Sequence, residues 1–104
     1  MPADETPVLD TLAAMTLVSV EQSNLPADAF LLVRIAALAA VDARPVSYLA
    51  HVGAAADAGL TVESVQDVLV AVAPIIGTAR VVSAAIAIAE ALNFAIAVIE
   101  EESN

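Results

Sequence analysis

Long runs of alanine, valine, leucine and isoleucine, broken at intervals by proline and glycine, are the feature that most constrains this chain. Alanine and leucine favour helices, and small side chains let helices approach closely. Hydrophobic residues make up 61% of the 104 residues and aromatic residues only 3%, so the apolar mass is mainly aliphatic. A chain of this length forms one domain around one core. We expect an all-α, single-domain bundle of about five or six helices over residues 1–104, with 1–6 and 100–104 flexible.

Proline, glycine and threonine mark the expected helix ends. Pro7 and Pro26 suit the first turns of helices, because proline at that position loses no hydrogen bond. Gly59 is a typical helix terminator, and Thr61 is the expected N-cap of the helix that follows. Pro74 is expected to bend or end that helix. The predicted helices cover about residues 7–21, 26–41, 46–58, 62–76 and 78–99.

The apolar content exceeds what so small a monomer can hide, because soluble monomers rarely expose large contiguous apolar patches. The mean hydropathy is +0.89. Self-association is the simplest remedy, so we expect a homo-oligomer. The rival explanation, a membrane span, needs about 18 or more uninterrupted apolar residues. The longest candidate, 68–79, is interrupted by Pro74 and Gly77, so no membrane span is expected. The acidic N-terminus resembles no targeting signal, which makes the cytoplasm the expected location.

Charge and cysteine content exclude several classes of function. Thirteen acidic and three basic residues give a formal charge of −10, which repels phosphate backbones, so nucleic acid is not an expected partner. The chain has no cysteine, which removes disulfides, thiolate metal ligands and thiol nucleophiles. The single histidine has no acidic pair at ligand spacing, so no metal site is predicted. No cofactor motif is visible either.

The rare polar side chains gather in one stretch, residues 33–59. It holds the single histidine, His51, the single tyrosine, Tyr48, and two of the three arginines, Arg34 and Arg44. Any chemistry that this apolar chain performs is therefore expected here. Imidazole titrates near neutral pH and suits proton transfer.

Several motifs in this region resemble the carboxymuconolactone decarboxylase family, which also contains the alkylhydroperoxidase-like proteins. They are the helix RIAALAA, the histidine-bearing segment YLAH, the connection AADAGLTVESV and the break before the last helix, APIIG. The resemblance covers about residues 31–92. It implies an alkylhydroperoxidase-like, all-helical subunit that assembles into trimers or hexamers.

The resemblance also implies two kinds of chemistry. Alkylhydroperoxidase-like members use two cysteines three residues apart, the second four residues before the histidine, and a glutamate on the preceding helix. Aligning His51 with the family histidine places Ser47 and Arg44 at the cysteine positions and Leu32 near the glutamate. A serine hydroxyl cannot cycle through a disulfide, so this chain lacks the groups for thiol peroxidase activity.

Decarboxylase members act on a small lactone that carries carboxylates. Such chemistry needs a group that moves a proton at carbon and donors that hold anionic oxygens. The sequence offers His51 as the proton-transfer group, with Ser47 one helical turn earlier on the same face. The arginines are the expected carboxylate ligands. The predicted catalytic residues are thus His51 and Ser47, and the predicted substrate-binding residues are Arg34, Arg44, Arg80 and Tyr48.

Each of these residues also has a purely structural interpretation. His51 and Tyr48 are typical of packed core or interface residues, and Ser47 is typical of a helix start. Arg34 and Arg80 are equally typical of ion pairs between subunits. The two functional hypotheses are an enzyme acting on a small organic acid and a non-catalytic helical oligomer that binds a ligand or partner. Candidate carboxylate partners for the arginines are Asp28, Asp57 and Asp67.

Overall fold

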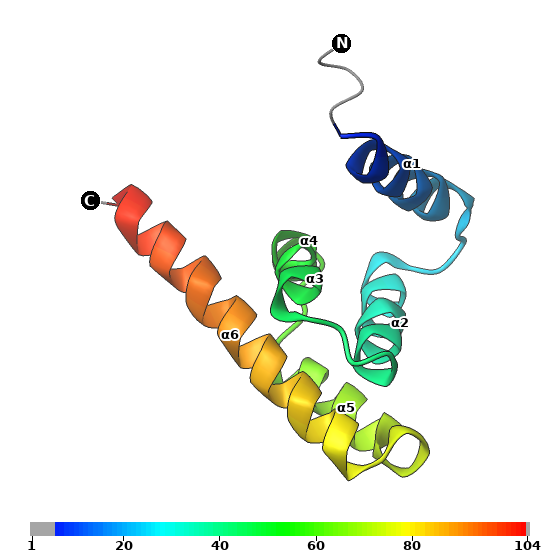
Figure 1. The fold of residues 1–104 in the computed structure, drawn as a ribbon, viewed down its shortest axis with the longest axis vertical. Coiled ribbons are helices and arrows are strands. Elements are labelled where there is room, and N and C mark those ends of the chain that lie inside the picture. Colours follow the sequence, from blue (N-terminus) through cyan, green and yellow to red (C-terminus); the bar gives the residue numbers. More distant parts are fainter. Residues whose placement is uncertain (1–5, 104) are drawn as a thin grey trace.

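The computed structural model describes residues 6–103, which form helices and no strands (Figure 1). The predicted all-α fold is confirmed. The helix that the sequence places over about 78–99 extends to residue 103, and the segment 1–5, predicted to be flexible, lies outside the described residues. The helices are α1 (Pro7–Gln22), α2 (Ala27–Ala40), α3 (Pro45–Leu49), α4 (Val52–Asp57), α5 (Val62–Ile76) and α6 (Thr78–Ser103).

Local signals end most of these helices where expected. The Thr61 side chain accepts a hydrogen bond from the Ser64 amide at 3.1 Å, which caps α5. Gly59 has a φ of +79°, and the amide of Leu60 reaches back to Ala55, the hydrogen-bond pattern of a Schellman motif. Pro74 does not end α5, which continues to Ile76 and stops at Gly77.

Asp42 ends α2 in the same way without a glycine. Its φ is +56°, a conformation that aspartate tolerates better than most side chains. The amide of Ala43 bonds to the carbonyl of Leu38, again as in a Schellman motif. The Ser83 hydroxyl on α6 donates to the Asp42 carboxylate, so the end of α2 is fastened to α6.

The helix predicted over 46–58 is wrong as one element, because it breaks at His51 into α3 and α4. The cause is a side-chain hydrogen bond. The Nδ1 atom of His51 lies 2.8 Å from the Ser47 carbonyl, the oxygen that the His51 amide would bond in a continuous helix. The His51 amide donates instead to the Tyr48 carbonyl, which is three residues earlier in the chain and not four. The backbone tightens there, and α4 begins at Val52.

The core lies where α6 crosses the other helices, and α6 contributes mainly alanine. Ala84 packs with residues of α2 and α5, while Ala87 and Ala91 pack with Ile35 and Tyr48 of α2 and α3. Small side chains allow this close approach. The buried residues are few and number eight in the part of the chain described: Leu31, Ile35, Ala39, Tyr48, Leu69, Ala84, Ala87 and Ala91.

The first helix has no buried residue and stands apart from the α2–α6 core (Figure 1). The sequence predicts an apolar face on this helix that needs a partner. Leu9, Leu12 and Met15 on that face are 64%, 51% and 61% exposed, so the described chain leaves it largely uncovered.

The last helix contains a longer apolar stretch than the segment 68–79 named from the sequence. Residues 78–101 of α6 are long and apolar enough to cross a membrane, by length and composition. The expectation that 68–79 is the longest apolar candidate is therefore wrong, because this later stretch is longer. Core helices share this composition, and α6 contacts α2, α3, α4 and α5. From Asn93 to Glu101 most residues are exposed, among them Phe94 at 59% and Ile96 at 53%.

Tyr48 gives the core a measurable dependence on alkaline pH. Burial, and then the negative charge of Asp42, raise the pKa of the Tyr48 hydroxyl above its ordinary value of about 10. The unfolded chain therefore releases this proton before the folded chain does. Folding stability from this group is fully present below about pH 10 and is lost as pH rises toward the folded pKa.

We predict that the free energy of unfolding in urea falls as the pH rises above about 10, by at most about 1.4 kcal/mol per pH unit. The chain has no lysine, and arginine stays charged in this range, so Tyr48 is the side chain that titrates there. The Tyr48→Phe variant should show a flat profile over the same range. An equal fall in the variant would contradict the assignment.

Candidate active site

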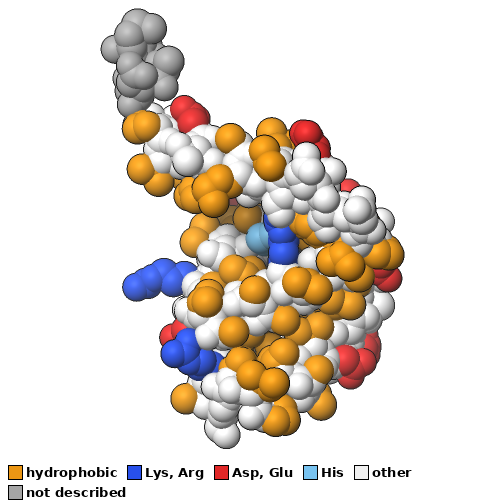
Figure 2. Space-filling view, turned by 90° about the vertical axis from the view of Figure 1, so that its right-hand side faces the viewer, with side chains coloured by type: hydrophobic (Ala, Val, Ile, Leu, Met, Phe, Trp, Pro, Cys, Tyr) orange, Lys and Arg blue, Asp and Glu red, His pale blue; other side chains and the backbone are white. Residues whose placement is uncertain are grey.

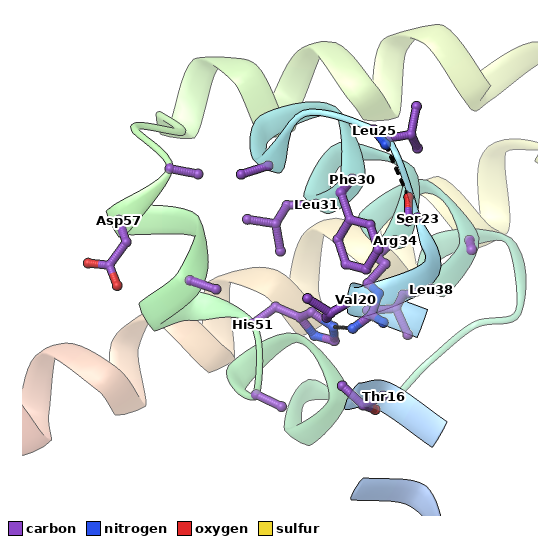
Figure 3. A pocket seen from close by; sticks show the side chains of 15 residues that line it. Thr16, Val20, Ser23, Leu25, Phe30, Leu31, Arg34, Leu38, His51 and Asp57 are labelled. Carbon is purple, nitrogen blue, oxygen red and sulfur yellow. Dashed lines mark hydrogen bonds between the residues drawn. The ribbon is translucent and has the colours of Figure 1, made fainter. Parts of the chain in front are cut away.

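A wide cavity of about 870 Å³ lies between α1, α2 and the α3–α4 segment. Figure 2 shows the imidazole beside an arginine side chain in the hollow below α1. The walls are mostly apolar, with Val20 from α1 and Phe30, Leu31 and Leu38 from α2. Arg34 and His51 meet inside it (Figure 3). Such a mainly apolar cavity with a few converging polar groups is typical of a small-molecule site.

Two hydrogen bonds orient the His51 ring. A carbonyl oxygen only accepts, so the contact with Ser47 at 2.8 Å places a proton on Nδ1. A guanidinium only donates, so the contact of 3.4 Å between Arg34 Nη1 and His51 Nε2 leaves Nε2 as the acceptor. The two contacts agree on one neutral tautomer. Its lone pair is on Nε2, at the cavity side of the ring.

Arg34 carries the positive charge of the site without a carboxylate partner among the side chains described, residues 6–101. Its guanidinium lies 4.3 Å above the centre of the Phe30 ring, a cation–π contact that holds the group flat. Asp57 also lines the cavity but points away from Arg34 (Figure 3). Five N–H donors in a planar fork, only one of them engaged with His51, match a carboxylate ligand.

Ser47 contacts His51, but through its backbone. The sequence predicts a role for its hydroxyl, whereas the carbonyl makes the observed hydrogen bond, and the residue does not line the cavity. Arg44 is exposed at the N-terminus of α3 and also lies outside the cavity lining. Of the predicted site residues, the cavity thus brings together Arg34 and His51.

Arg80 and Tyr48 lie elsewhere. Arg80, at the start of α6, donates a hydrogen bond to the Ala40 carbonyl and so stabilises the end of α2. Tyr48 is 5% exposed, packs in the core and borders a second, smaller cavity on the other side of His51. Neither residue lines the Arg34 cavity.

Sequence reasoning missed Phe30. The signal was available, because Phe30 lies four residues before Arg34 and side chains at that spacing meet on a helix. Sequence reasoning also missed α1 as one wall of the site. Thr16 and Val20 reach the cavity, but the helix is separated from α2 by a loop whose path the residue pattern does not specify. No group of three metal-ligating side chains occurs among the described side chains of residues 6–101.

Comparison with known proteins agrees with this arrangement of helices. Residues 7–91 match the carboxymuconolactone decarboxylase family. The chain belongs to this family. The match begins earlier than the resemblance noted from the motifs, so α1 is part of the family's domain. No curated protein and no solved structure matches the chain significantly.

Membership of this family indicates a range of functions, either carboxymuconolactone decarboxylase-like or alkylhydroperoxidase-like. Within that range, the chain retains a histidine and has no cysteine. The histidine of this family member is oriented by a backbone carbonyl and faces an arginine. That environment offers a proton acceptor beside an anion-binding group.

We predict that the neutral His51 ring carries its proton on Nδ1. Because this is the single histidine, ¹⁵N NMR of histidine-labelled protein reports it without assignment. The Arg34→Met variant should keep the same tautomer, since the bond to the Ser47 carbonyl remains. A ring protonated on Nε2 instead would show that this oriented geometry is absent in solution.

Proposed function

We propose that this family member performs acid/base chemistry on a small, carboxylate-bearing lactone or related organic acid. The observation that carries the proposal is the pair of Arg34 and His51, side by side in an open, mostly apolar cavity. Arg34 binds the substrate carboxylate and His51 transfers the proton. A decarboxylase-type lyase reaction fits both roles, and family membership supports it.

Binding and chemistry are coupled through the Arg34–His51 contact. In the free site, one guanidinium N–H points at the Nε2 lone pair, at the long distance of 3.4 Å. A substrate carboxylate competes for the same fork with a stronger, charge-assisted hydrogen bond. Arg34 then turns toward the substrate and Nε2 becomes free. The bond to the Ser47 carbonyl keeps the ring in place during this exchange.

The proton inventory is simple. Loss of carbon dioxide from an unsaturated lactone acid leaves the electron pair of the broken carbon–carbon bond delocalised over the lactone. A proton must then be added at carbon. His51 Nε2 takes one proton from solvent water and delivers it to this carbon, so that a carboxylate substrate and one proton give carbon dioxide and the protonated lactone, while Arg34 stabilises the remaining anionic oxygens. Phe30 limits the movement of the guanidinium, which lowers the cost of ordering it.

We predict that His51→Ala lowers the kcat for a carboxylate-bearing lactone by about 10²- to 10⁴-fold, the usual contribution of general acid–base catalysis. Arg34→Met should mainly raise KM, by about 10- to 100-fold, because it removes a charge-assisted hydrogen bond. Release of carbon dioxide measures both effects. The matched control is Arg44→Met, which removes an exposed arginine outside the cavity and should change neither constant. Unchanged turnover in His51→Ala would refute the proposal.

The alternative is a non-catalytic oligomer that binds a small organic acid. One observation favours it: both ring nitrogens of His51 are already hydrogen-bonded in the free site. In that case Arg34 holds the ligand and no proton moves. Calorimetry separates the two functions, since saturable binding of the acid that depends on Arg34, without release of carbon dioxide, is expected only of the non-catalytic protein.

We also propose that the chain works as a homo-oligomer, with a trimer or hexamer as the expected size. The described structure is too open for an isolated subunit. Its Cα radius of gyration is 15.0 Å, against about 13 Å for a compact chain of this length. It exposes 7233 Å², whereas a folded monomer of its mass exposes roughly 5,400 Å².

The size of this excess suggests how many neighbours each subunit has. An excess of roughly 1,800 Å² is about twice the roughly 800 Å² that one partner contributes to a standard interface. In a ring, every subunit contacts two neighbours. The uncovered apolar faces of α1 and of the C-terminal part of α6 are the surfaces available for those contacts.

We predict that Leu12→Glu, on the uncovered face of α1, reduces the oligomer to smaller species at micromolar concentration. Burying an unpaired carboxylate in an apolar interface is costly. The matched control is Ala14→Glu, which adds the same charge at an exposed position on the opposite side of α1. Light scattering coupled to size-exclusion chromatography measures the mass. A wild-type monomer would contradict the proposal.

A further inference from the structure

The cavity between α1, α2 and the α3–α4 segment holds a single positive charge. Of the described residues that line it, Arg34 is the one cation and Asp57 the one carboxylate. Besides His51, the other polar side chains of the lining are the neutral hydroxyls of Thr16 and Ser23. Asp57 lies apart from Arg34 and points away from it (Figure 3). A ligand that extends across the cavity from Arg34 therefore meets no second cation.

The other basic groups of the chain do not add a second carboxylate ligand. The chain has no lysine, and Arg80 donates to the Ala40 carbonyl at the start of α6. Arg44 is exposed at the N-terminus of α3 and lies outside the lining. The ring of His51 adds no charge in the free site, because Nε2 must be unprotonated to accept from Arg34.

This charge distribution disfavours a ligand with two carboxylates. With one carboxylate on Arg34, the second would face apolar side chains or the carboxylate of Asp57. A carboxylate that loses its hydration without gaining a partner is costly, and like charges repel each other. The formal charge of −10 adds a general repulsion that grows with the charge of the ligand. A monocarboxylate carries only the charge that Arg34 neutralises.

The rest of the cavity favours a hydrocarbon body on the ligand. The large apolar side chains of the lining are Val20, Leu25, Phe30, Leu31 and Leu38. The volume of about 870 Å³ is near the upper end of the range typical of small-molecule sites, so the cavity has room for more than the acid group. Each CH₂ group that such walls remove from water strengthens binding, by up to about four-fold.

We propose that the acid bound in this cavity is a monocarboxylate with an apolar body, and that dicarboxylates of the same length bind poorly. Arg34 selects for the carboxylate, the apolar walls bind the hydrocarbon, and Asp57 opposes a second negative charge. This preference rests on the proposed function, in which Arg34 binds a carboxylate, and it narrows the class of substrate. It applies equally to the ligand of a non-catalytic protein.

Hexanoate and adipate are a matched pair of probes, since both have six carbons and they differ in the second carboxylate. NMR of the single histidine, labelled in its ring, reports binding without assignment. At about 0.15 M salt the charge of the chain is screened beyond about 8 Å, so a preference measured there is local. We expect hexanoate to bind at least ten-fold more tightly than adipate. In Arg34→Met the affinity for hexanoate should fall about 10- to 100-fold, while that for 1-hexanol stays the same.

A series of acids and a pair of variants locate the hydrocarbon. Affinity should rise from butanoate to hexanoate to octanoate, by about two- to fifteen-fold for each two CH₂ groups. Val20→Ser makes the α1 wall polar and should weaken octanoate about two- to five-fold. Val18→Ser makes the same change on α1 at an exposed position outside the lining and should leave octanoate unchanged. Equal binding of butanoate and octanoate would overturn the proposal, as would equal binding of octanoate to Val20→Ser and wild type.

The variant Arg34→Met separates failure of this preference from failure of the proposed function. Adipate that binds as tightly as hexanoate, with both affinities dependent on Arg34, would overturn the preference and leave the proposed function intact. If neither affinity depended on Arg34, the binding step of the proposed function would be wrong, and the preference for one carboxylate would be wrong with it.

Discussion

The contact between α6 and the helices that carry the site depends on alanine. Ala84, Ala87 and Ala91 recur along one face of α6 and are 1%, 6% and 2% exposed. Their small size brings the backbone of α6 close to α2 and α3, so that Ile35 and Tyr48 pack directly on it. Arg34 precedes Ile35, and Ser47 precedes Tyr48. The same alanine face therefore fixes the positions of the guanidinium and of the carbonyl that orients His51.

Much of the fold could be predicted from the sequence because its boundaries depend on local chemistry. Gly59 ends a helix through its own backbone conformation, and Thr61 begins the next helix through its own side chain. Both do so where expected. The break at His51 could not be predicted in this way. At that position the side chain and the backbone amide of His51 compete as donors to the Ser47 carbonyl, and the side chain makes the hydrogen bond. Residue type alone does not decide between them.

The site was only partly predictable for a related reason. Arg34 and Arg80 give the same signal in the sequence, a cation within an apolar helix. Arg80 lies in the first turn of α6, next to the end of α2, and so it finds a backbone carbonyl. Arg34 lies in the middle of α2, where the backbone carbonyls are already used, and it reaches Phe30 and His51 instead. Tertiary position, and not residue type, separates a capping arginine from a candidate ligand-binding one.

The proposed role of the histidine needs none of the thiols that alkylhydroperoxidase-like members use. The resemblance places Ser47 at the position of the second cysteine, and Ser47 contributes a backbone carbonyl there, which any residue supplies. A serine at that position lacks the redox chemistry of a cysteine but still supports the ring. With Nδ1 held by the backbone, the proposed function makes the reactivity of Nε2 depend on what competes for Arg34. Under that proposal a carboxylate ligand frees the lone pair, and its departure returns the guanidinium to the ring. The same arginine would then link occupancy of the cavity to the availability of the base.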